Sequence, residues 1–408
     1  RRSDEGSLRN RRRGCESDVP QPLIRQAPPA TFSLKGRRKT LADQHPRRRA
    51  RFIGDLGPRQ HPRDLFLTPR VVQGVDGGGG QAVAVGAVLR RERDPDRAAD
   101  PDLDAVRGAV DVPVLCIGNF TVGGGGKTPT ALAMAGAAEA CGLRPGFLSR
   151  GYGGSAGGPL LVDPSAHAAR LVGDEPLLLA ARAPTVVAKD RGAGARYLVD
   201  TVGVDFIIMD DGFQSARLCI DFALLAIDAG RGLGNGQVVP SGPLRAPLKD
   251  QIRHADALLV IGEGAAGAQA IRLTARGGKP VFEARLEPRA HALAGRRVLA
   301  FAGIADPEKF YRSLRAVGAD IVRTRDFPDH HPFQPAEISE LIADAARDGL
   351  HLVTTRKDAA RMAGDGHAAR RLLAEASVLD IDLVFEPSTL GTRFVTETRE
   401  AFRHRKFG

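Results

Sequence analysis

The chain has 408 residues, 42% of them hydrophobic and 26% charged, a composition typical of a soluble globular protein with two or three domains and not of a disordered or fibrous one. Its four cysteines are far apart and form no CxxC pair, which argues against a disulfide framework or a zinc site. The net charge of +11 is concentrated at one end. Residues 1–110 hold 23 Lys and Arg against 14 Asp and Glu, a net of +9, so the remainder carries only +2 and a nucleic-acid-binding core is not indicated.

Residues 1–110 differ in composition from the rest of the chain. They contain arginine runs at Arg11–Arg13 and Arg47–Arg49, a Gly77–Gly80 tract, many prolines and no sustained period of 2 or 3.6. Such a segment buries too little apolar surface to offset chain entropy, so we expect it to be disordered and basic. Because it begins without an initiator Met, we also expect a mis-called start. No apolar run reaches the roughly 18–20 residues that span a bilayer, so the sequence predicts no integral anchor.

From about Val112, short apolar runs alternate with Ala-rich or amphipathic stretches. Apolar strands separated by helices are typical of parallel sheets covered on both faces. We therefore predict an α/β fold: a P-loop NTPase-like parallel sheet flanked by helices in residues 111–290, and a second, smaller α/β lobe in residues 291–408. The predicted strands are Val114–Ile117, Thr185–Ala188, Phe206–Met209, Ala223–Ile227, Ala257–Ile261, Pro280–Phe282, Val298–Phe301, Ile321–Val322, Leu352–Thr354 and Leu379–Val384. The predicted helices include Thr130–Ala140, Pro307–Ala316 and Pro335–Arg347.

A glycine-rich loop follows the first predicted strand and leads into a helix near Pro129. Its residues are Thr121, Val122, Gly123, Gly124, Gly125, Gly126, Lys127 and Thr128. Glycines let backbone N–H groups converge on phosphate oxygens, Lys127 can reach the β- and γ-phosphates, and the Thr128 hydroxyl can ligate Mg²⁺. Thr121 stands where the strict motif has Gly, and a flexible turn with a chance Gly-Lys-Thr is the alternative interpretation. The order of strand, loop and helix favours a P-loop that binds ATP and Mg²⁺.

Two carboxylates end a later predicted strand. Asp210 and Asp211 follow the apolar run Phe206–Met209, about eighty residues after the loop, where P-loop enzymes place a residue that holds Mg²⁺. Asp-Gly is also common turn chemistry, so the pair alone does not decide between a turn and a metal site. Together with the loop, it predicts Thr128, Asp210 and Asp211 as metal ligands, and leaves open which carboxylate touches the ion.

Ten short blocks between about Val112 and Val384, taken in order, resemble the tetraacyldisaccharide 4′-kinase family, the lipid A 4′-kinases. The blocks are Thr121–Thr128, Ser149–Gly154, Val172–Pro176, Lys189–Arg191, Asp210–Gln214, Gly234–Gly236, Pro240–Arg245, Phe301–Ile304, Asp329–His331 and Thr354–Asp358. The resemblance implies transfer of the γ-phosphate of ATP, with Mg²⁺, to the 4′-hydroxyl of a tetraacylated glucosamine disaccharide 1-phosphate, giving lipid IVA. It further implies an acylated disaccharide lipid and a membrane surface as partners, no nucleic acid, no obligate protein partner, and a place at the cytoplasmic face of the bacterial inner membrane.

The resemblance also assigns roles to single residues. Asp174 resembles the family's catalytic base and His330 its partner, with Lys127 as the catalytic phosphate clamp. A carboxylate can take the proton of a sugar hydroxyl, and a histidine can orient that carboxylate. Without the resemblance, both residues are ordinary loop or turn residues. Three further residues are expected to contact the acidic substrate: Arg150, Arg245 and Asn235.

The sequence departs from the family pattern at several points. Gly125 stands where Thr is frequent, Ser215 where His is usual, and Arg356 where an acid is usual. Family members begin with an apolar membrane-associating helix, whereas this chain has the arginine-rich segment. Two other function classes are considered: a deviant P-loop ATPase switch of the partitioning or maturation type, and a nucleotide-binding module. The loops of the switch class usually carry a second lysine early in the motif, and Thr121–Gly123 contains none. A base and its partner at Asp174 and His330 favour the kinase over the binding module, because a binding module has no use for an acceptor-side base.

Overall fold

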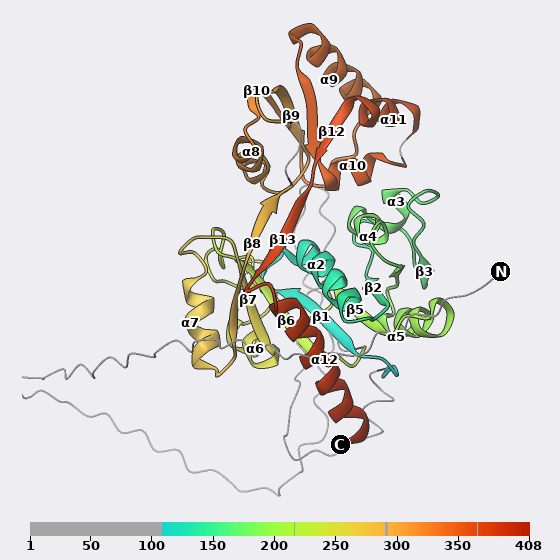
Figure 1. Ribbon diagram of the computed structural model, residues 1–408, viewed down its shortest axis with the longest axis vertical. Helices are drawn as coiled ribbons and strands as arrows, with labels where there is room; N and C mark the ends of the chain where they lie inside the picture. Colours follow the sequence, from blue (N-terminus) through green and yellow to red (C-terminus); the bar gives the residue numbers. More distant parts are fainter. Residues whose placement is uncertain (1–107, 216, 290–292, 365) are drawn as a thin grey trace, which may run out of the picture. The chain divides into compact units, whose positions relative to one another are not determined.

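The structure, a computed structural model, describes residues 108–408 except 216, 290–292 and 365 (Figure 1). The predicted disordered segment 1–110 and the suspected mis-called start lie outside the described residues, apart from residues 108–110. Within the described part of the chain, none of the helices has the length and apolarity needed to cross a membrane.

A nine-stranded sheet forms the larger part of the fold, in the order β13-β8-β7-β6-β1-β5-β2-β4-β3. All neighbouring strands are parallel except the pairs β3–β4 and β8–β13, which are antiparallel. The predicted α/β class, with a largely parallel P-loop-like sheet, is confirmed. The strands are β1 (Val114–Asn119), β2 (Pro145–Ser149), β3 (Leu160–Leu161), β4 (Thr185–Val187), β5 (Phe206–Asp210), β6 (Phe222–Asp228), β7 (Ala257–Ile261), β8 (Val281–Pro288) and β13 (Ile381–Glu386).

Helices cover both faces of this sheet (Figure 1), which is why its central strands are apolar except at their carboxyl ends. Successive side chains of a strand point to opposite faces. Leu115 of β1 accordingly packs in one core with Met134 and Phe394, whereas Cys116 packs in the other with Leu198. The helical elements are α2 (Lys127–Ala140), α3 (Ala169–Val172), α4 (Asp174–Ala180), α5 (Arg191–Tyr197), the π-helical turn η1 (Leu198–Val202), α6 (Leu248–His254), α7 (Ala268–Arg276) and α12 (Leu390–Phe407).

A second sheet, with its helices, forms what we call the second lobe. Its four strands lie in the order β10-β9-β11-β12 and are all parallel. The elements are β9 (Arg297–Ala302), α8 (Pro307–Ala316), β10 (Asp320–Asp326), α9 (Pro335–Asp348), β11 (His351–Thr355), α10 (Arg356–Met362), α11 (Gly366–Glu375) and β12 (Ala376–Leu379).

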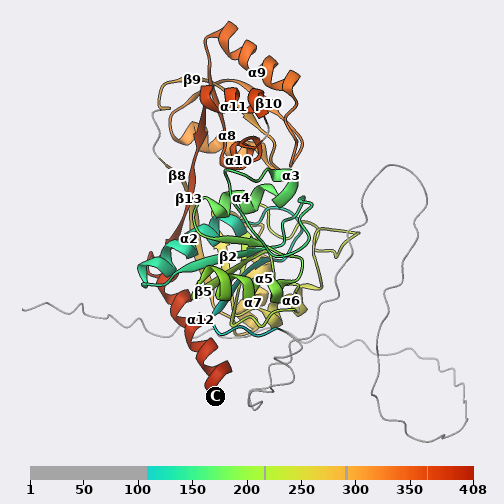
Figure 2. The same cartoon turned by 90° about the vertical axis from the view of Figure 1, so that its right-hand side faces the viewer.

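The end of the chain returns to the larger sheet, which differs from the expected division at residues 291–408. The predicted strand Leu379–Val384 is two strands, because β12 ends at Leu379 and β13 begins at Ile381. β13 pairs with β8, and α12 packs against α2 (Figure 2). The apolar side chains of both elements, including Phe385 and Phe394, complete the core of the larger sheet. Burial of these residues explains why the last segment lies there.

Candidate functional site

The glycine-rich loop joins β1 to α2, and its backbone conformation requires glycine at Gly126. This residue is the N-cap of α2 and has φ of 81°, in the left-handed region. A Cβ atom at Gly126 would lie 2.3 Å from Cδ1 of Ile261 on β7. Gly123 also has a positive φ, 91°. The glycine-rich loop therefore continues directly into the N-terminus of α2. Backbone N–H groups of such a loop and helix N-terminus can bind anions such as phosphate.

Lys127, the first residue of α2, lies folded over this loop. Its side chain is almost completely buried, and Nζ donates a hydrogen bond of 3.3 Å to the carbonyl oxygen of Gly123. The same nitrogen lies 3.7 Å from Oδ2 of Asp211. Asn119, at the end of β1, donates from Nδ2 to Gly123 as well. The ammonium group is thus held at the loop, at the place where a phosphate chain would lie.

Arg245 supports the loop from the neighbouring segment. Its Nε donates to the carbonyl oxygen of Thr121 at 3.0 Å, and its Nη2 donates to Asp211 at 2.8 Å. The amide of Val122 donates to the carbonyl oxygen of Pro243, which ties the two segments together. Arg245, predicted as a substrate contact, therefore binds the first residue of the glycine-rich loop and Asp211.

Asn235, the second predicted substrate contact in this region, is engaged in its own loop. Its Nδ2 donates to the carbonyl oxygen of Ser241, and its Oδ1 accepts from the amide of Gln237. A Cβ at Gly242 would lie 2.0 Å from this Oδ1, so the loop closes tightly around the asparagine. Both polar ends of Asn235 thus stabilise the segment that carries Arg245.

Thr128 and Asp210 lie together at the end of β5. The Thr128 hydroxyl donates to Oδ2 of Asp210 at 3.3 Å, and Oδ1 of Asp210 is buried without a hydrogen-bond partner among the described residues. Burial, helped by the negative charge of Glu175, raises the pKa of Asp210 to about 7. A buried carboxylate oxygen without a donor, beside a hydroxyl, fits a hard cation such as Mg²⁺, which prefers oxygen ligands.

Asp211 has a different environment from Asp210. Burial opposes its ionisation, but Lys127 and Arg245 outweigh that effect and lower the pKa of Asp211. Its φ of 54° turns the chain sharply after β5. Within the described ranges, no cluster of three or more His, Cys, Asp or Glu side chains could hold a metal. A metal held by Thr128, Asp210 and Asp211 would therefore take its remaining ligands from phosphate and water, as Mg²⁺ commonly does.

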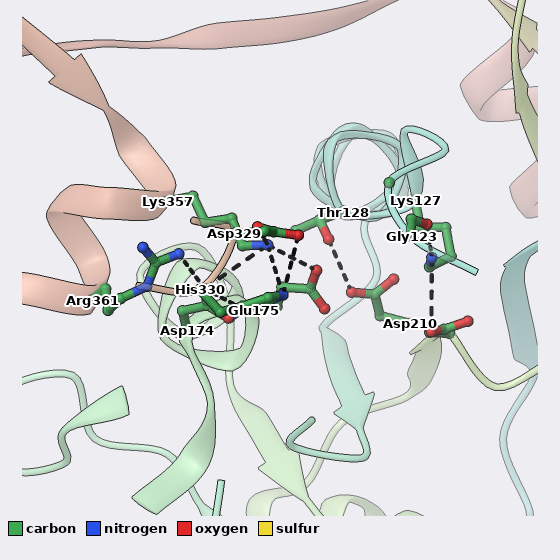
Figure 3. A network of polar contacts seen from close by, with 12 residues as sticks. Gly123, Lys127, Thr128, Asp174, Glu175, Asp210, Asp329, His330, Lys357 and Arg361 are labelled. Carbon is green, nitrogen blue, oxygen red and sulfur yellow. Dashed lines mark hydrogen bonds and ion pairs between the residues drawn. The ribbon is translucent and has the colours of Figure 1, made fainter. Parts of the chain in front are cut away.

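Asp174 begins α4, and its carboxylate meets three side chains of the second lobe (Figure 3). Oδ2 lies 3.0 Å from Nδ1 of His330, accepts a 2.8 Å hydrogen bond from Nη2 of Arg361, and lies 3.9 Å from Nζ of Lys357. Burial disfavours the charged carboxylate, but these three partners outweigh it and hold the pKa of Asp174 well below its ordinary range. The hydrogen bond to Asp174 raises the pKa of His330, against the opposing effect of burial.

Two residues of this cluster, Lys357 and Arg361, had no predicted role. Both lie on α10 at i and i+4, and this spacing places them on one face of the helix. Lys357 lies 3.4 Å from Nε2 of His330, and 3.7 Å from both Glu175 and Asp329. The spacing was visible in the sequence, but it does not show that the shared face meets Asp174.

Glu175 connects the two groups of predicted residues. It follows Asp174 in the chain, contacts Lys357, and its charge contributes to the raised pKa of Asp210 (Figure 3). The structure thus brings the loop, Thr128 and Asp210 near Asp174 and His330.

Arg150, the remaining predicted substrate contact, is exposed. Burial of Arg191, and after it the positive charge of Arg150, lower the pKa of Arg191 to about 10.

Comparisons with known proteins agree on one family. The family description tetraacyldisaccharide-1-P 4′-kinase (LpxK) matches residues 97–399. The chain is 55% identical over 290 residues to a tetraacyldisaccharide 4′-kinase of Agrobacterium fabrum, covering 71% of this chain and 83% of that protein. It is 50% identical over 326 residues to the enzyme of that name from Mesorhizobium japonicum, covering 80% and 91%. A crystal structure of LpxK from Aquifex aeolicus in complex with ATP superposes with a TM-score of 0.55 at 27% identity, covering 71% of this chain and 89% of that one. The chain therefore belongs to the tetraacyldisaccharide 4′-kinase family.

Proposed function

We propose that this protein transfers the γ-phosphoryl group of ATP to the 4′-hydroxyl of tetraacyldisaccharide 1-phosphate, giving lipid IVA. Its family makes it a kinase, and the ATP complex of the Aquifex aeolicus relative supports ATP as the donor. The observation that carries the proposal is the proximity, through Glu175, of a phosphate-binding loop to an Asp–His pair whose carboxylate is buried (Figure 3). The loop provides groups that can hold a phosphoryl donor, and the Asp–His pair provides a base for an acceptor hydroxyl.

On the nucleotide side, the backbone of Gly123–Gly126 and the N-terminus of α2 hold the phosphates, and Lys127 neutralises part of their charge. We propose Thr128, Asp210 and Asp211 as the residues that hold Mg²⁺, with the unpartnered Oδ1 of Asp210 as the main ligand. When bound, Mg²⁺ supplies positive charge to the phosphate oxygens. Most catalysis of phosphoryl transfer comes from such positioning and charge neutralisation.

On the acceptor side, the two oxygens of Asp174 have different partners. Oδ2 is occupied by His330 and Arg361, whereas Oδ1 accepts only the amide of Glu175, at 3.0 Å, among the contacts of the described residues. Oδ1 is therefore available to take the 4′-hydroxyl proton as the new oxygen–phosphorus bond forms and the bond to the ADP oxygen breaks. A weak base suffices, because in a loose transition state the hydroxyl proton is lost late. His330 orients the carboxylate.

We assign the remaining predicted residues as follows. Arg150, exposed and beside Arg191, contacts the acidic disaccharide substrate. Arg245 and Asn235 support the phosphate loop through their partners beneath it. The acylated substrate brings the enzyme to a membrane surface, and the need for ATP places it at the cytoplasmic face of the inner membrane. The deviant P-loop ATPase switch is not favoured, because the family match extends across both lobes.

The test is transfer of radiolabelled γ-phosphate from ATP to tetraacyldisaccharide 1-phosphate in detergent micelles with Mg²⁺. Label in the lipid fraction is expected with this acceptor and not with one that lacks the 4′-hydroxyl. Release of labelled inorganic phosphate without labelled lipid would contradict the kinase and support an ATPase.

A further inference from the structure

We propose that Arg361 is a positioning residue for the base: its guanidinium group fixes Oδ2 of Asp174 and so leaves Oδ1 to the acceptor hydroxyl. The inference rests on the proposed function and adds to it a residue of the second lobe. Asp174 belongs to α4 and Arg361 to α10, and 187 positions separate them in the chain.

The guanidinium group bridges two buried carboxylates. Nη2 donates to Asp174 and Nη1 donates to Oδ1 of Asp358, each at 2.8 Å. The side chains are 5% exposed at Arg361, 4% at Asp174 and 0% at Asp358. A buried charge is tolerated when it is paired and hydrogen-bonded, and the rigid planar fork of arginine holds two acceptors in fixed directions. The geometry is that of an oriented clamp.

Other groups of the second lobe hold this guanidinium group in place through hydrogen bonds. Oδ2 of Asp358 accepts from the amide of Gly303 and from the Thr355 hydroxyl, which fixes the partner of Arg361. The carbonyl oxygens of Gly303 and His331 each accept from Nη1 at 3.2 Å.

Gly303 has little room for a side chain beside this guanidinium group. A Cβ there would lie 3.1 Å from Nη1 of Arg361 and 3.2 Å from Oδ1 of Asp358, closer than side chains usually approach. Gly303, Thr355 and Asp358, from two blocks to which no role was assigned from the sequence, thus serve to place Arg361.

Arg361 differs from the other partners of Asp174 in being permanently charged and buried. His330 is 35% exposed and loses its charge when it deprotonates, and Lys357 lies farther away, at 3.9 Å. The acidic neighbours, Glu175 and Asp329, face Lys357. Arg361 therefore keeps Oδ2 occupied and the carboxylate ionised across the pH range in which His330 titrates.

The experiment compares the full-length wild-type protein with Arg361→Met and Arg361→Lys, and with Arg356→Met as the matched control. Arg356 lies on the same helix but is half-exposed and pairs with Asp380. We expect Arg361→Met to lower kcat at least about tenfold with an unchanged KM for ATP, because the base loses its orientation. We also expect the acid limb of kcat/KM to move up by about one pH unit or more, because an adjacent positive charge is lost. Arg356→Met should match the wild type.

Arg361→Lys keeps the charge and loses the fork, so its acid limb should stay near that of the wild type while kcat falls. This variant also decides the matter if Arg361→Met does not fold. Full kcat in Arg361→Lys, or a loss in Arg361→Met that follows the folded fraction with no movement of the acid limb, would overturn the proposal.

NMR titration of the His330 ring gives a readout that needs no turnover. Loss of a nearby positive charge should raise the pKa of His330 further in Arg361→Met, and an unchanged titration would count against the clamp. If the wild type transfers no phosphate, the proposed function fails while this titration still tests whether Arg361 acts on the Asp–His pair.

Discussion

Nδ1 of His330 lies 3.0 Å from Oδ2 of Asp174, although 156 positions separate the two residues in the chain. Asp174 begins α4, beside the larger sheet, and His330 lies in the turn after β10 of the second lobe. The φ of His330 is 61°, a left-handed conformation that histidine adopts more readily than most residues. The pair therefore depends on tertiary structure, and mutations at either end should affect the same step.

Asp174→Asn should reduce kcat by at least about 100-fold, because the amide has nearly the same shape but cannot accept the hydroxyl proton. ATP affinity should be unchanged, since Asp174 contacts neither the loop nor Lys127 in the described structure. Steady-state kinetics with nucleotide titration would measure both. Asp200→Asn, at an exposed position of η1, is the control and should keep full activity. Retained turnover in Asp174→Asn would remove this residue from the mechanism.

Lys127→Ala should also lower turnover by at least about 100-fold, since a charge held at the phosphates is lost. Lys249→Ala, at an exposed position of α6, removes a lysine elsewhere and should have no effect. The measurement is initial rate against ATP concentration. Equal rates for the two variants would mean that the ammonium group at the loop does not take part.

Asp210→Asn should raise the Mg²⁺ concentration needed for half-maximal rate at least about tenfold, the effect of losing roughly 1.4 kcal/mol of binding. The reason is that the carboxylate loses its charge, and this carboxylate accepts from Thr128 through Oδ2 while its Oδ1 has no partner among the described residues. Rates would be measured over a range of Mg²⁺ at saturating ATP. An unchanged Mg²⁺ requirement would shift the metal site to Asp211 or elsewhere.

Gly126→Ala should abolish tight ATP binding and destabilise the fold by about 1–3 kcal/mol, because a side chain is forced into left-handed backbone. The new Cβ would also meet Cδ1 of Ile261. Adding Ile261→Val removes that atom and should recover part of the stability. Gly142→Ala is the control, since its φ is 76° and no atom lies within 4 Å of the added Cβ. Chemical denaturation would measure the free energy of unfolding of each variant and so separate backbone strain from the clash. Equal losses of stability in Gly126→Ala and Gly142→Ala would show that the contact with Ile261 has no effect.

The pH dependence of stability should report on the His330 pair. The folded-state pKa of His330 is raised above 6.5, so its contribution is fully present below pH 6.5 and is lost as the pH rises through the folded-state pKa. Asp174 has a lowered pKa, so its contribution is lost only as the pH falls through that value, below this window. Urea unfolding of the wild type should therefore show a fall in stability above pH 6.5 that His330→Asn lacks. Parallel pH profiles for the two proteins would contradict the pairing.

The sequence was sufficient for the phosphate loop, because strand, glycine-rich turn and helix are local patterns, and α8 begins and ends where it was predicted. It was not sufficient for β2, since Pro145 and Gly146 at its start are typical of turns, yet the strand is buried between β4 and β5. The predicted strand Leu379–Val384, in which Asp380 and Asp382 interrupt the apolar residues, likewise concealed a change of sheet at Asp380. Sheet membership is decided by packing partners that a local pattern does not contain.

The candidate site divides in the same way. Thr128 and Asp210 could be predicted from the sequence, because each lies in or after a recognisable strand of the same sheet. The two residues lie within hydrogen-bonding distance. Asp174 and His330 were identified through family resemblance, because nothing in their local sequence distinguishes them from loop residues. Arg361 was missed, since its proposed role depends on contacts with Asp174 and Gly303, which are distant from it along the chain.

The most direct test of the central claim is the location of radiolabel after the full-length protein and its Asp174→Asn variant are incubated with γ-labelled ATP, Mg²⁺ and tetraacyldisaccharide 1-phosphate in micelles, with ATP binding measured on the same samples. We predict labelled lipid carrying a new phosphate at the 4′ position with the wild type, at least about 100-fold less with the variant, and equal ATP binding by both. Bound ATP without labelled lipid in the wild type, or equal labelling by the two proteins, would contradict the account.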